Sequence, residues 1–251
     1  MQLTVIGCAG SFPSPQSPAS CYLVEHEGAA LVLDLGNGSL GPLAAHADLR
    51  TIEAVVLSHL HADHCLDLTS MYVARKYHPA GPPVTPLAVH APAGARQRFI
   101  DAYRTEPGEQ VAADAIFTFR DHEALPVTIG PFTITVARVA HPVPAYGIRV
   151  AAGGASLVYS GDTGPCEALV ELSRGADLAL FEASFLTGPG NAVDLHLTAA
   201  QAGEHAARAG VPRLLLTHLV AWNDPATSYA QAREAYDGEL ALAAPGMVVA
   251  L

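Results

Sequence analysis

The sequence predicts a single α/β domain spanning residues 1–251, and three observations support this. Short runs of apolar and β-branched residues recur along the chain, with turn residues between them. Several runs are almost continuously apolar, which is typical of strands in sheets that are covered on both faces. Half of the residues are hydrophobic and 15% are charged, so the chain can bury a large core and is not disordered.

Strands are expected where the apolar runs are richest in β-branched residues. These runs are residues 4–6, 21–24, 30–33, 54–57, 87–89, 132–139, 156–159, 178–181, 214–216 and 247–251. Helical spacing of apolar residues fits segments 66–77, 93–105, 166–174, 198–209 and 226–236. Thr198 can cap the start of the fourth helix and Gly210 can end it. The pattern predicts hairpins in the first half and alternating strands and helices in the second.

Charge and apolar pattern exclude several classes of protein. The chain has 13 basic and 24 acidic residues, which gives a formal net charge of -11. Such an acidic protein gains little from counterion release on a long polyanion, so binding to long nucleic acid is disfavoured. No apolar run approaches the roughly 20 residues of a membrane helix, and no signal peptide is visible. The 4 cysteines lack paired spacing, and together these features predict a cytoplasmic protein with reduced thiols.

A dense run of metal-ligating side chains follows the apolar segment 54–57. It reads Ser58-His59-Leu60-His61-Ala62-Asp63-His64. Imidazole and carboxylate groups suit zinc and its neighbours in the first transition row. His59 and His61 are two residues apart on an extended chain, so their side chains point the same way. Asp63 and His64 follow a turn and can address a second ion, so the run predicts two metal sites.

Three more apolar segments each end at one residue that can bind a metal. Segments 132–140, 157–160 and 214–217 lead to His141, Asp162 and His218. Sites of α/β proteins are built at the carboxyl ends of strands. Taken singly, each residue is more simply an ordinary strand-end side chain. Beside the run at 58–64, the three together predict the remaining ligands.

With these residues the sequence resembles the metallo-β-lactamase superfamily, and within it the phosphodiesterase branch that includes ribonuclease Z. Two further runs match the first and second motifs of that branch. They are Val5-Ile6-Gly7-Cys8-Ala9-Gly10-Ser11-Phe12-Pro13 and Leu33-Asp34-Leu35-Gly36-Asn37-Gly38. The resemblance covers nearly the whole chain. It implies a four-layer αββα sandwich of the α/β (α+β) class, with the site at one edge of the two sheets.

The resemblance also implies how the ligands are divided. One ion would be bound by His59, His61 and His141, the other by Asp63, His64 and His218, with Asp162 bridging them. Asp34 would orient the ligand-bearing loop rather than bind a metal. The expected cofactors are two divalent metal ions, with Zn²⁺ favoured and Mn²⁺ or Fe²⁺ also compatible with these donors. Two such ions can hold a bridging water as hydroxide at neutral pH, and Asp63 would orient or deprotonate that water.

Two other segments indicate a catalytic acid. Leu180-Phe181-Glu182-Ala183-Ser184-Phe185 is similar to the His-Glu-Ala-Thr segment of ribonuclease Z, and Leu195-His196-Leu197-Thr198 to its His-Ser-Thr segment. In that branch the histidine of the second segment contacts the scissile phosphate and acts as the acid, supported by the glutamate of the first. The corresponding residues here are His196 and Glu182. Phe181 departs from the family pattern, and a simple loop histidine before a helix cap is the alternative for His196.

The substrate expected from the resemblance is a 3′,5′-cyclic nucleotide, with cyclic AMP favoured. The motifs around Cys21, Asp63, Asp162 and His196 are similar to those of compact actinobacterial cyclic AMP phosphodiesterases, and the family implies a homodimer. Nothing in the chain corresponds to the long basic arm with which ribonuclease Z grips tRNA. The alternatives are tRNA 3′ processing, hydrolysis of another small phosphodiester, hydrolysis of a lactone or thioester, and non-catalytic binding.

Three residues are candidates for holding the nucleoside. Tyr72 and Arg75 lie one turn apart on the helix expected after the metal-ligating run, and Trp222 follows the strand that ends at His218. Ordinary packing explains each of the three equally well.

Overall fold

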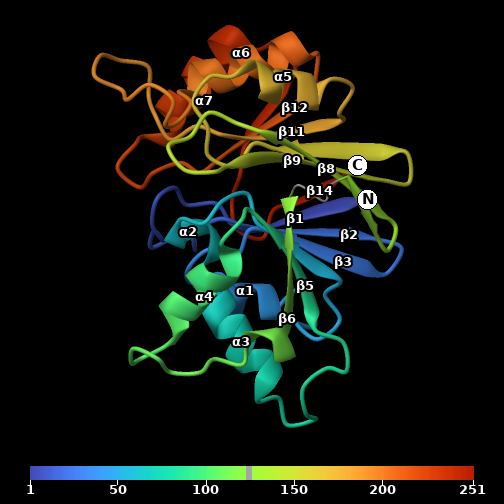
Figure 1. Ribbon diagram of the computed structural model, residues 1–251. Helices are drawn as coiled ribbons and strands as arrows, with labels where there is room; N and C mark the ends of the chain where they lie inside the picture. The colour runs from blue at the N-terminus through green and yellow to red at the C-terminus, as the bar shows by residue number, and fades with distance from the viewer. Residues whose placement is uncertain (123–125) are drawn as a thin grey trace.

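The computed structural model describes residues 1–122 and 126–251, and over these residues its strands form two seven-stranded sheets packed face to face (Figure 1). The first sheet has the strand order β14-β1-β2-β3-β4-β5-β6 and the second β13-β12-β11-β10-β9-β8-β7. The strands of the first are β1 (Gln2–Gly7), β2 (Cys21–His26), β3 (Ala29–Leu33), β4 (Ala54–Val56), β5 (Leu87–Ala91), β6 (Phe117–Asp121) and β14 (Val248–Ala250). Those of the second are β7 (Val127–Ile129), β8 (Phe132–Arg138), β9 (Tyr146–Ala152), β10 (Ala155–Tyr159), β11 (Leu178–Glu182), β12 (Arg213–Thr217) and β13 (Glu239–Leu242).

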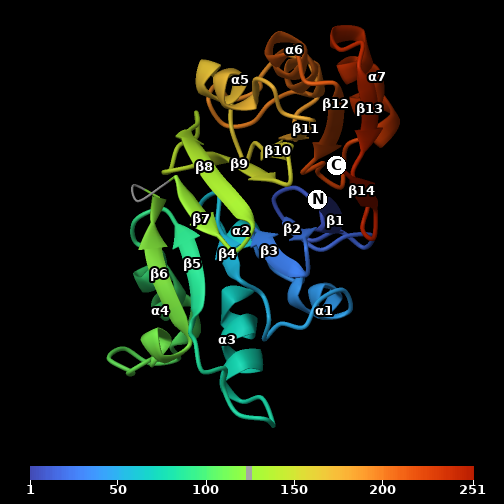
Figure 2. The same cartoon turned by 90° about the vertical axis from the view of Figure 1, so that its right-hand side faces the viewer.

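Helices cover the outer face of each sheet. In Figures 1 and 2, α1, α3 and α4 lie on one side of the paired sheets and α5, α6 and α7 on the other. The helices are α1 (Leu40–Ala44), α2 (Ala62–Cys65), α3 (Leu68–Lys76), α4 (Ala95–Tyr103), α5 (Glu167–Ser173), α6 (Ala199–Ala209) and α7 (Pro225–Ala235). This arrangement confirms the predicted four-layer αββα fold. Among the described residues, no helix is long and apolar enough to cross a membrane.

Three buried apolar clusters fill the spaces between the four layers. Leu31 and Leu33 on β3 pack in the cluster between the two sheets, whereas Val32 packs in the cluster beneath the helices of the first half. The third cluster joins the second sheet to its helices and includes Phe181. Successive side chains of a strand point to opposite faces, and here both faces are buried. This explains why the strands read as almost continuous apolar runs.

Strand direction determines where the site forms. The neighbours from β3 to β6 and from β10 to β13 are parallel. β1 runs in the same direction as β3, because both are antiparallel to β2, and β8 runs in the same direction as β10, because both are antiparallel to β9. The carboxyl ends of these strands therefore lie at one edge. Hairpins connect β1 to β3 as expected, but the prediction of hairpins through the rest of the first half is wrong for β3 to β6.

Helix α6 begins and ends where the sequence indicates. The Thr198 hydroxyl accepts a hydrogen bond from the Gln201 N–H, and the Gln201 side chain accepts one from the Thr198 N–H. This reciprocal pair is a capping box, which satisfies two backbone donors at the helix start. Gly210 follows the helix with φ 69°, a left-handed conformation that glycine adopts without strain. The capping box fixes the loop that carries His196, two residues before the cap.

Candidate metal centre

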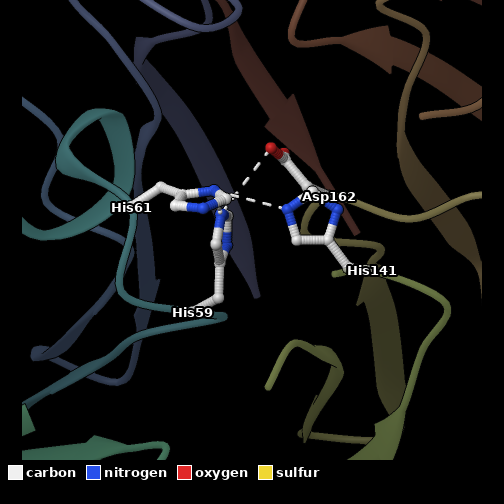
Figure 3. Close-up of side chains that lie close together, drawn as sticks. All are labelled: His59, His61, His141 and Asp162. Atoms are coloured by element: carbon white, nitrogen blue, oxygen red, sulfur yellow. Dashed lines mark hydrogen bonds and ion pairs between the residues drawn. The ribbon is translucent and has the colours of Figure 1, made fainter. Parts of the chain in front are cut away.

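All the predicted metal ligands come together at the edge where the strand ends meet. One group joins His59, His61, His141 and Asp162, whose ligand atoms all lie within 4.8 Å of one another (Figure 3). A second group, Asp63, His64, Asp162 and His218, meets the same limit. The ligands come from the segments after β4, β8, β10 and β12 and from α2. Asp162 belongs to both groups, and the family resemblance implies the same shared position.

Hydrogen bonds on the far side of two imidazole rings determine which nitrogen faces the centre. The Nδ1–H of His64 donates to Asp34 Oδ2 at 2.7 Å, and the Nδ1–H of His141 donates to the Leu195 carbonyl at 2.9 Å. A neutral imidazole carries one proton, so Nε2 of each ring presents a lone pair. These are the donor atoms that a metal ion requires.

Serine hydroxyls orient two more rings in the same way. The Ser58 hydroxyl donates to Asp34 Oδ2 at 2.7 Å and therefore accepts from His59 Nδ1, 3.1 Å away. The Ser184 hydroxyl donates to the His218 carbonyl at 3.0 Å and accepts from His218 Nδ1 at 2.7 Å. Each hydroxyl has a single proton, so its second contact must be as an acceptor. The Nε2 lone pairs of both histidines thus also face the centre.

These lone pairs are close enough to need a cation between them. Nε2 of His64 and Nε2 of His218 are 3.2 Å apart, and Asp63 Oδ2 lies 3.1 Å from His218 Nε2. Asp162 is buried, and among the described residues its Oδ1 accepts no hydrogen bond. Facing lone pairs and buried carboxylates are unfavourable unless positive charge compensates them. Nitrogen and oxygen donors in this arrangement fit two divalent ions, which the fold also implies.

The pKa values of His59 and His64 depend on burial, which opposes a charge on the ring, and on nearby carboxylates, which favour one. Burial lowers the pKa of His59 well below its usual range, which keeps this ring neutral. Burial also opposes a charge on His64, but the carboxylates of Asp162 and Asp34 together raise its pKa well above the usual value. In the metal-free protein a proton on His64 therefore supplies part of the missing positive charge. Metal binding must displace that proton.

Asp34 anchors the loop that carries the ligands, which agrees with its expected orienting role. It is fully buried and accepts hydrogen bonds from the Ser58 N–H at 2.6 Å, from the Tyr159 hydroxyl at 2.7 Å and from His64. The sequence did not indicate Tyr159, although it lies three residues before Asp162 in the same motif. Ser184 was likewise missed as a partner of His218. The feature that could have indicated Ser184 is its place in the same motif, two residues after Glu182.

Backbone strain is concentrated around this centre. Among the described non-glycine residues, Ser11, Asp34, Asp194 and His218 have φ between 54° and 63°, and the remaining positive value is at Glu27 in the β2–β3 turn. Left-handed backbone costs such residues about 1–3 kcal/mol each and persists only when the surrounding contacts enforce it. Asp34 and His218 belong directly to the centre or its support. The fold thus accepts strain in order to place these groups.

His196 and Glu182 form a buried acid pair beside the ligands. The Nδ1–H of His196 donates to Glu182 Oε1 at 2.9 Å. Glu182 also accepts from the N–H groups of Thr163 at 2.9 Å and Ser184 at 3.0 Å. Burial opposes a charge on His196, but the Glu182 carboxylate raises its pKa to about 9. His196 is therefore protonated at neutral pH and can act as a general acid.

Phe181 stands where ribonuclease Z has a histidine, and the structure shows what Phe181 and the neighbouring Glu182 do instead. Phe181 is fully buried in the cluster between the second sheet and its helices, so it is a core residue. Backbone N–H groups occupy both oxygens of Glu182, which favours a positioning role over metal binding for this residue. This holds although Glu182, His196 and His218 also lie within 4.8 Å of one another. A cleft of ≈ 390 Å³ opens beside His196, between the 187–193 loop and the start of α6.

Two of the three candidates for holding the nucleoside need correction. Tyr72 is 1% exposed and packs against Phe99 in the core, and the buried Arg75 guanidinium donates to the Leu49 carbonyl at 2.6 Å. Both residues are therefore structural, and their prediction as nucleoside contacts is wrong. His205 is buried as well and accepts a hydrogen bond from the Cys166 N–H at 3.1 Å. Trp222 is exposed and lies beside Phe12.

Comparison with known proteins gives consistent matches. Residues 31–219 match the model of the Beta-lactamase superfamily domain. The uncharacterized protein Rv1339 of Mycobacterium tuberculosis is 44% identical over 241 residues, covering 95% of this chain and 88% of the relative. The probable metallo-hydrolase YhfI of Bacillus subtilis is 31% identical over 252 residues, covering 99% of both, and its crystal structure superposes with a TM-score of 0.87, covering 99% of both chains. The ribonuclease Z of Mycolicibacterium gilvum is 32% identical over 241 residues, covering 88% of this chain and 84% of the relative.

Proposed function

Because the chain belongs to the β-lactamase superfamily and has the fold of its metal-dependent hydrolases, we propose that it hydrolyses 3′,5′-cyclic nucleotides to 5′-nucleotides, with cyclic AMP favoured. One observation carries this proposal. A protonated histidine, His196, lies against the two predicted metal groups, with its ring centroid 5.8 Å from that of His141 and 5.6 Å from that of His218. A phosphodiester held between metal ions and an acid is cleaved by attack on phosphorus and protonation of the leaving oxygen.

The ligand assignment follows the two groups of donors. His59, His61 and His141 would hold one ion, Asp63, His64 and His218 the other, and Asp162 would contact both. Zn²⁺ is the favoured metal, and Mn²⁺ or Fe²⁺ suits the same donors. When bound, divalent ions acidify water and offset the negative charge of a phosphodiester.

The remaining chemistry falls to two side chains. Burial opposes ionisation of Asp63, but His218 and His64 hold its pKa well below the usual range, so it is a carboxylate at neutral pH. Asp63 orients the attacking water and accepts its proton as the new P–O bond forms. The bond from phosphorus to O3′ breaks, and His196 protonates that oxygen. The products are a 5′-nucleotide phosphate and a free 3′-hydroxyl.

Size and charge favour a small substrate over a long one. The cleft of ≈ 390 Å³ beside His196 lies in the range of about 300–1,000 Å³ that is typical of small-molecule sites. The net charge of -11 opposes binding of an extended polyanion. The alternative, tRNA 3′ processing, draws support from the 32% identity to a ribonuclease Z. The two functions make different predictions for purified protein.

The test uses the full chain loaded with Zn²⁺ or Mn²⁺ and a panel of cyclic mononucleotides, cyclic dinucleotides and precursor tRNA. We expect conversion of cyclic AMP to 5′-AMP, which chromatography of the products measures. Asp162→Asn, which removes charge from the residue shared by both groups, should abolish this conversion. Asp177→Asn should not, because Asp177 lies just before β11 and its carboxylate accepts the Ser156 N–H away from the predicted ligands. Trimming of tRNA without turnover of any cyclic mononucleotide would refute the proposal and establish the alternative.

A further inference from the structure

Two exposed aromatic rings contact each other, one next to Ser11 and the other in the loop that follows the predicted ligand His218. Trp222 is 71% exposed and Phe12 is 38% exposed. Their ring centroids are 5.2 Å apart and the rings are tilted by 38°. Large apolar side chains grouped on a surface commonly mark a binding site. The question is whether the fold holds these two rings in a fixed relation to the catalytic groups.

The backbone at Phe12 is fixed against a predicted ligand. The N–H of Ser11 lies 3.3 Å from His218 Nε2, and the N–H of Phe12 donates to the Gly10 carbonyl at 2.8 Å, which closes a γ-turn at Ser11. Ser11 has φ 63° in this turn. A Cβ atom at Gly10 would lie 2.3 Å from the His218 carbonyl oxygen, so this position requires glycine. Phe12 is therefore held one residue from a contact with the centre.

The loop of Trp222 is fixed to the same side of the site. Trp222 follows His218 by four residues. The next residue, Asn223, donates its backbone N–H to the Val220 carbonyl at 3.0 Å and its side-chain amide to the Ser184 carbonyl at 2.8 Å. Ser184 is the residue whose hydroxyl orients His218. Both aromatic residues are thus connected through short contacts to one metal ligand.

We propose that Trp222, supported by Phe12, is the stacking surface for the nucleobase of the substrate. This inference rests on the proposed function and adds the residue that recognises the base. Every nucleobase presents a planar face, and stacking on an aromatic side chain is a general means of binding it. Trp222 is the more exposed ring, and the less exposed Phe12 packs against it.

The cleft beside His196 is the rival position for the base. Its described lining contains no phenylalanine, tyrosine or tryptophan, and it includes the carboxylate of Glu204. It therefore lacks a stacking surface of the kind that Trp222 provides. A base bound there would leave Trp222 free in solvent, which the following experiment detects.

Intrinsic fluorescence reports on the proposed contact directly, because the chain has 1 tryptophan. The metal-loaded full chain is titrated with 5′-AMP and, separately, with ribose 5-phosphate, which has the same phosphate and sugar but no base. We expect saturable quenching with 5′-AMP and little change with ribose 5-phosphate at equal concentration. Equal responses to the two ligands, or binding of 5′-AMP by calorimetry without quenching, would overturn the inference.

Kinetics of variants give a second readout. Loss of an aromatic stacking surface should raise KM for cyclic AMP in Trp222→Ala by roughly 10-fold, which corresponds to about 1.4 kcal/mol. We expect kcat to change little, and turnover of methyl riboside 3′,5′-cyclic phosphate, which has no base, to stay the same. Trp222→Phe should restore most of the affinity. Tyr77→Ala, at a 63% exposed aromatic residue after α3, is the matched control.

The outcomes separate the two proposals. Failure of the wild-type protein to turn over any cyclic nucleotide refutes the proposed function and, with it, the inference. Normal turnover combined with an unchanged KM in Trp222→Ala refutes the inference alone. A folded Trp222→Ala protein is verified by its thermal unfolding, and the phenylalanine variant keeps the test valid if alanine disturbs the loop.

Discussion

At the scale of single residues, buried partners determine what each functional side chain can do. Glu182 holds His196 in its protonated form, and Asp34 holds His64 with one nitrogen directed at the centre. Neither carboxylate is required to contact the substrate. Their effect is to select a protonation state or a tautomer, which a separate measurement can detect for each.

The pH dependence of turnover tests the pair of His196 and Glu182. In the metal-free protein the Glu182 carboxylate raises the pKa of His196 to about 9, and divalent ions bound nearby lower it from that value. We expect kcat/KM to fall as the pH rises through the pKa of His196 in the loaded protein, below about pH 9. In Glu182→Gln the negative charge is removed, so the falling limb should move to lower pH. An alkaline limb that stays in place would show that His196 is not the titrating acid.

Removal of the imidazole itself separates acid catalysis from metal binding. In His196→Ala, kcat should fall by about 10²- to 10⁴-fold, the usual contribution of a general acid. Its content of both metals, measured by plasma emission spectrometry, should equal that of the wild type. Loss of metal from this variant would instead identify His196 as a ligand.

Asp34→Asn tests the support of the ligand loop. The amide cannot accept from the Ser58 N–H, the Tyr159 hydroxyl and His64 as the carboxylate does. Loss of such a partner typically weakens metal binding by about 10- to 100-fold. Competition with a chelating dye measures this change. An affinity equal to that of the wild type would mean that His64 is oriented without Asp34.

At the scale of elements, the segment after β3 and helix α2 pack with almost no space between them. The N–H of Leu35 donates to the His64 carbonyl at 2.8 Å. A Cβ atom at Gly36 would lie 2.0 Å from the carbonyl oxygen of Asp63. This contact positions two predicted ligands by backbone, independently of their side chains.

Gly36→Ala should therefore destabilise the protein and disturb the site. Overpacking in a buried position typically costs about 1–3 kcal/mol, and here the neighbouring atom is backbone that cannot rotate away. Thermal unfolding should show a lower Tm than for Gly41→Ala, because a Cβ at Gly41 on α1 meets no atom within 4 Å. Equal Tm values for the two variants would show that the loop shifts without cost.

The sequence predicts most of the elements that are well covered and misses several that are short or at an edge, although the short edge strand β14 was predicted. β6 and β13 lie at the edges of their sheets, where fewer residues are buried and the apolar pattern is weak. The apolar pattern of β9 is interrupted by Gly147 and by Arg149. The Arg149 guanidinium donates to carbonyl groups at the end of α5. Helices α1 and α2 have 5 and 4 residues, too few to show helical periodicity.

The site divides in the same way. The candidate ligands are recognisable because four of them occur within six consecutive residues and the others follow apolar strands. Their hydrogen-bond partners come from distant segments. Tyr159 lies 125 residues from Asp34 in sequence, and Ser184 lies 34 residues from His218. Packing of the two sheets brings Tyr159 to Asp34, and the pairing of β11 with β12 brings Ser184 to His218, so no local pattern reveals either pair.

At the scale of the whole molecule, metal and protons compete for the same buried donors. In the metal-free protein the raised pKa of His64 contributes stability that is fully present below its unfolded value and is lost as the pH rises through the folded value. Metal binding has the opposite dependence, because it needs the deprotonated ring. The gap in Tm between loaded and metal-free protein should therefore be wider at about pH 8 than at about pH 6.

Calorimetry with and without chelator measures that gap. Ions at about 1,000 times their Kd add roughly 4 kcal/mol, which corresponds to a Tm difference on the order of 10 °C for a chain of this size. The variant Asp162→Asn should show a much smaller gap at either pH. A gap that does not change with pH would contradict the proposed displacement of the His64 proton.

The presence of Asp162 in both groups of predicted ligands has a mechanical consequence. One half of the chain supplies His59, His61, Asp63 and His64, and the other half supplies His141, Asp162 and His218. Bound ions would therefore cross-link the two sheets, and neither sheet could open alone without breaking metal–ligand bonds. Amide hydrogen exchange should show the two halves opening together in the loaded protein and at separate rates after the ions are stripped.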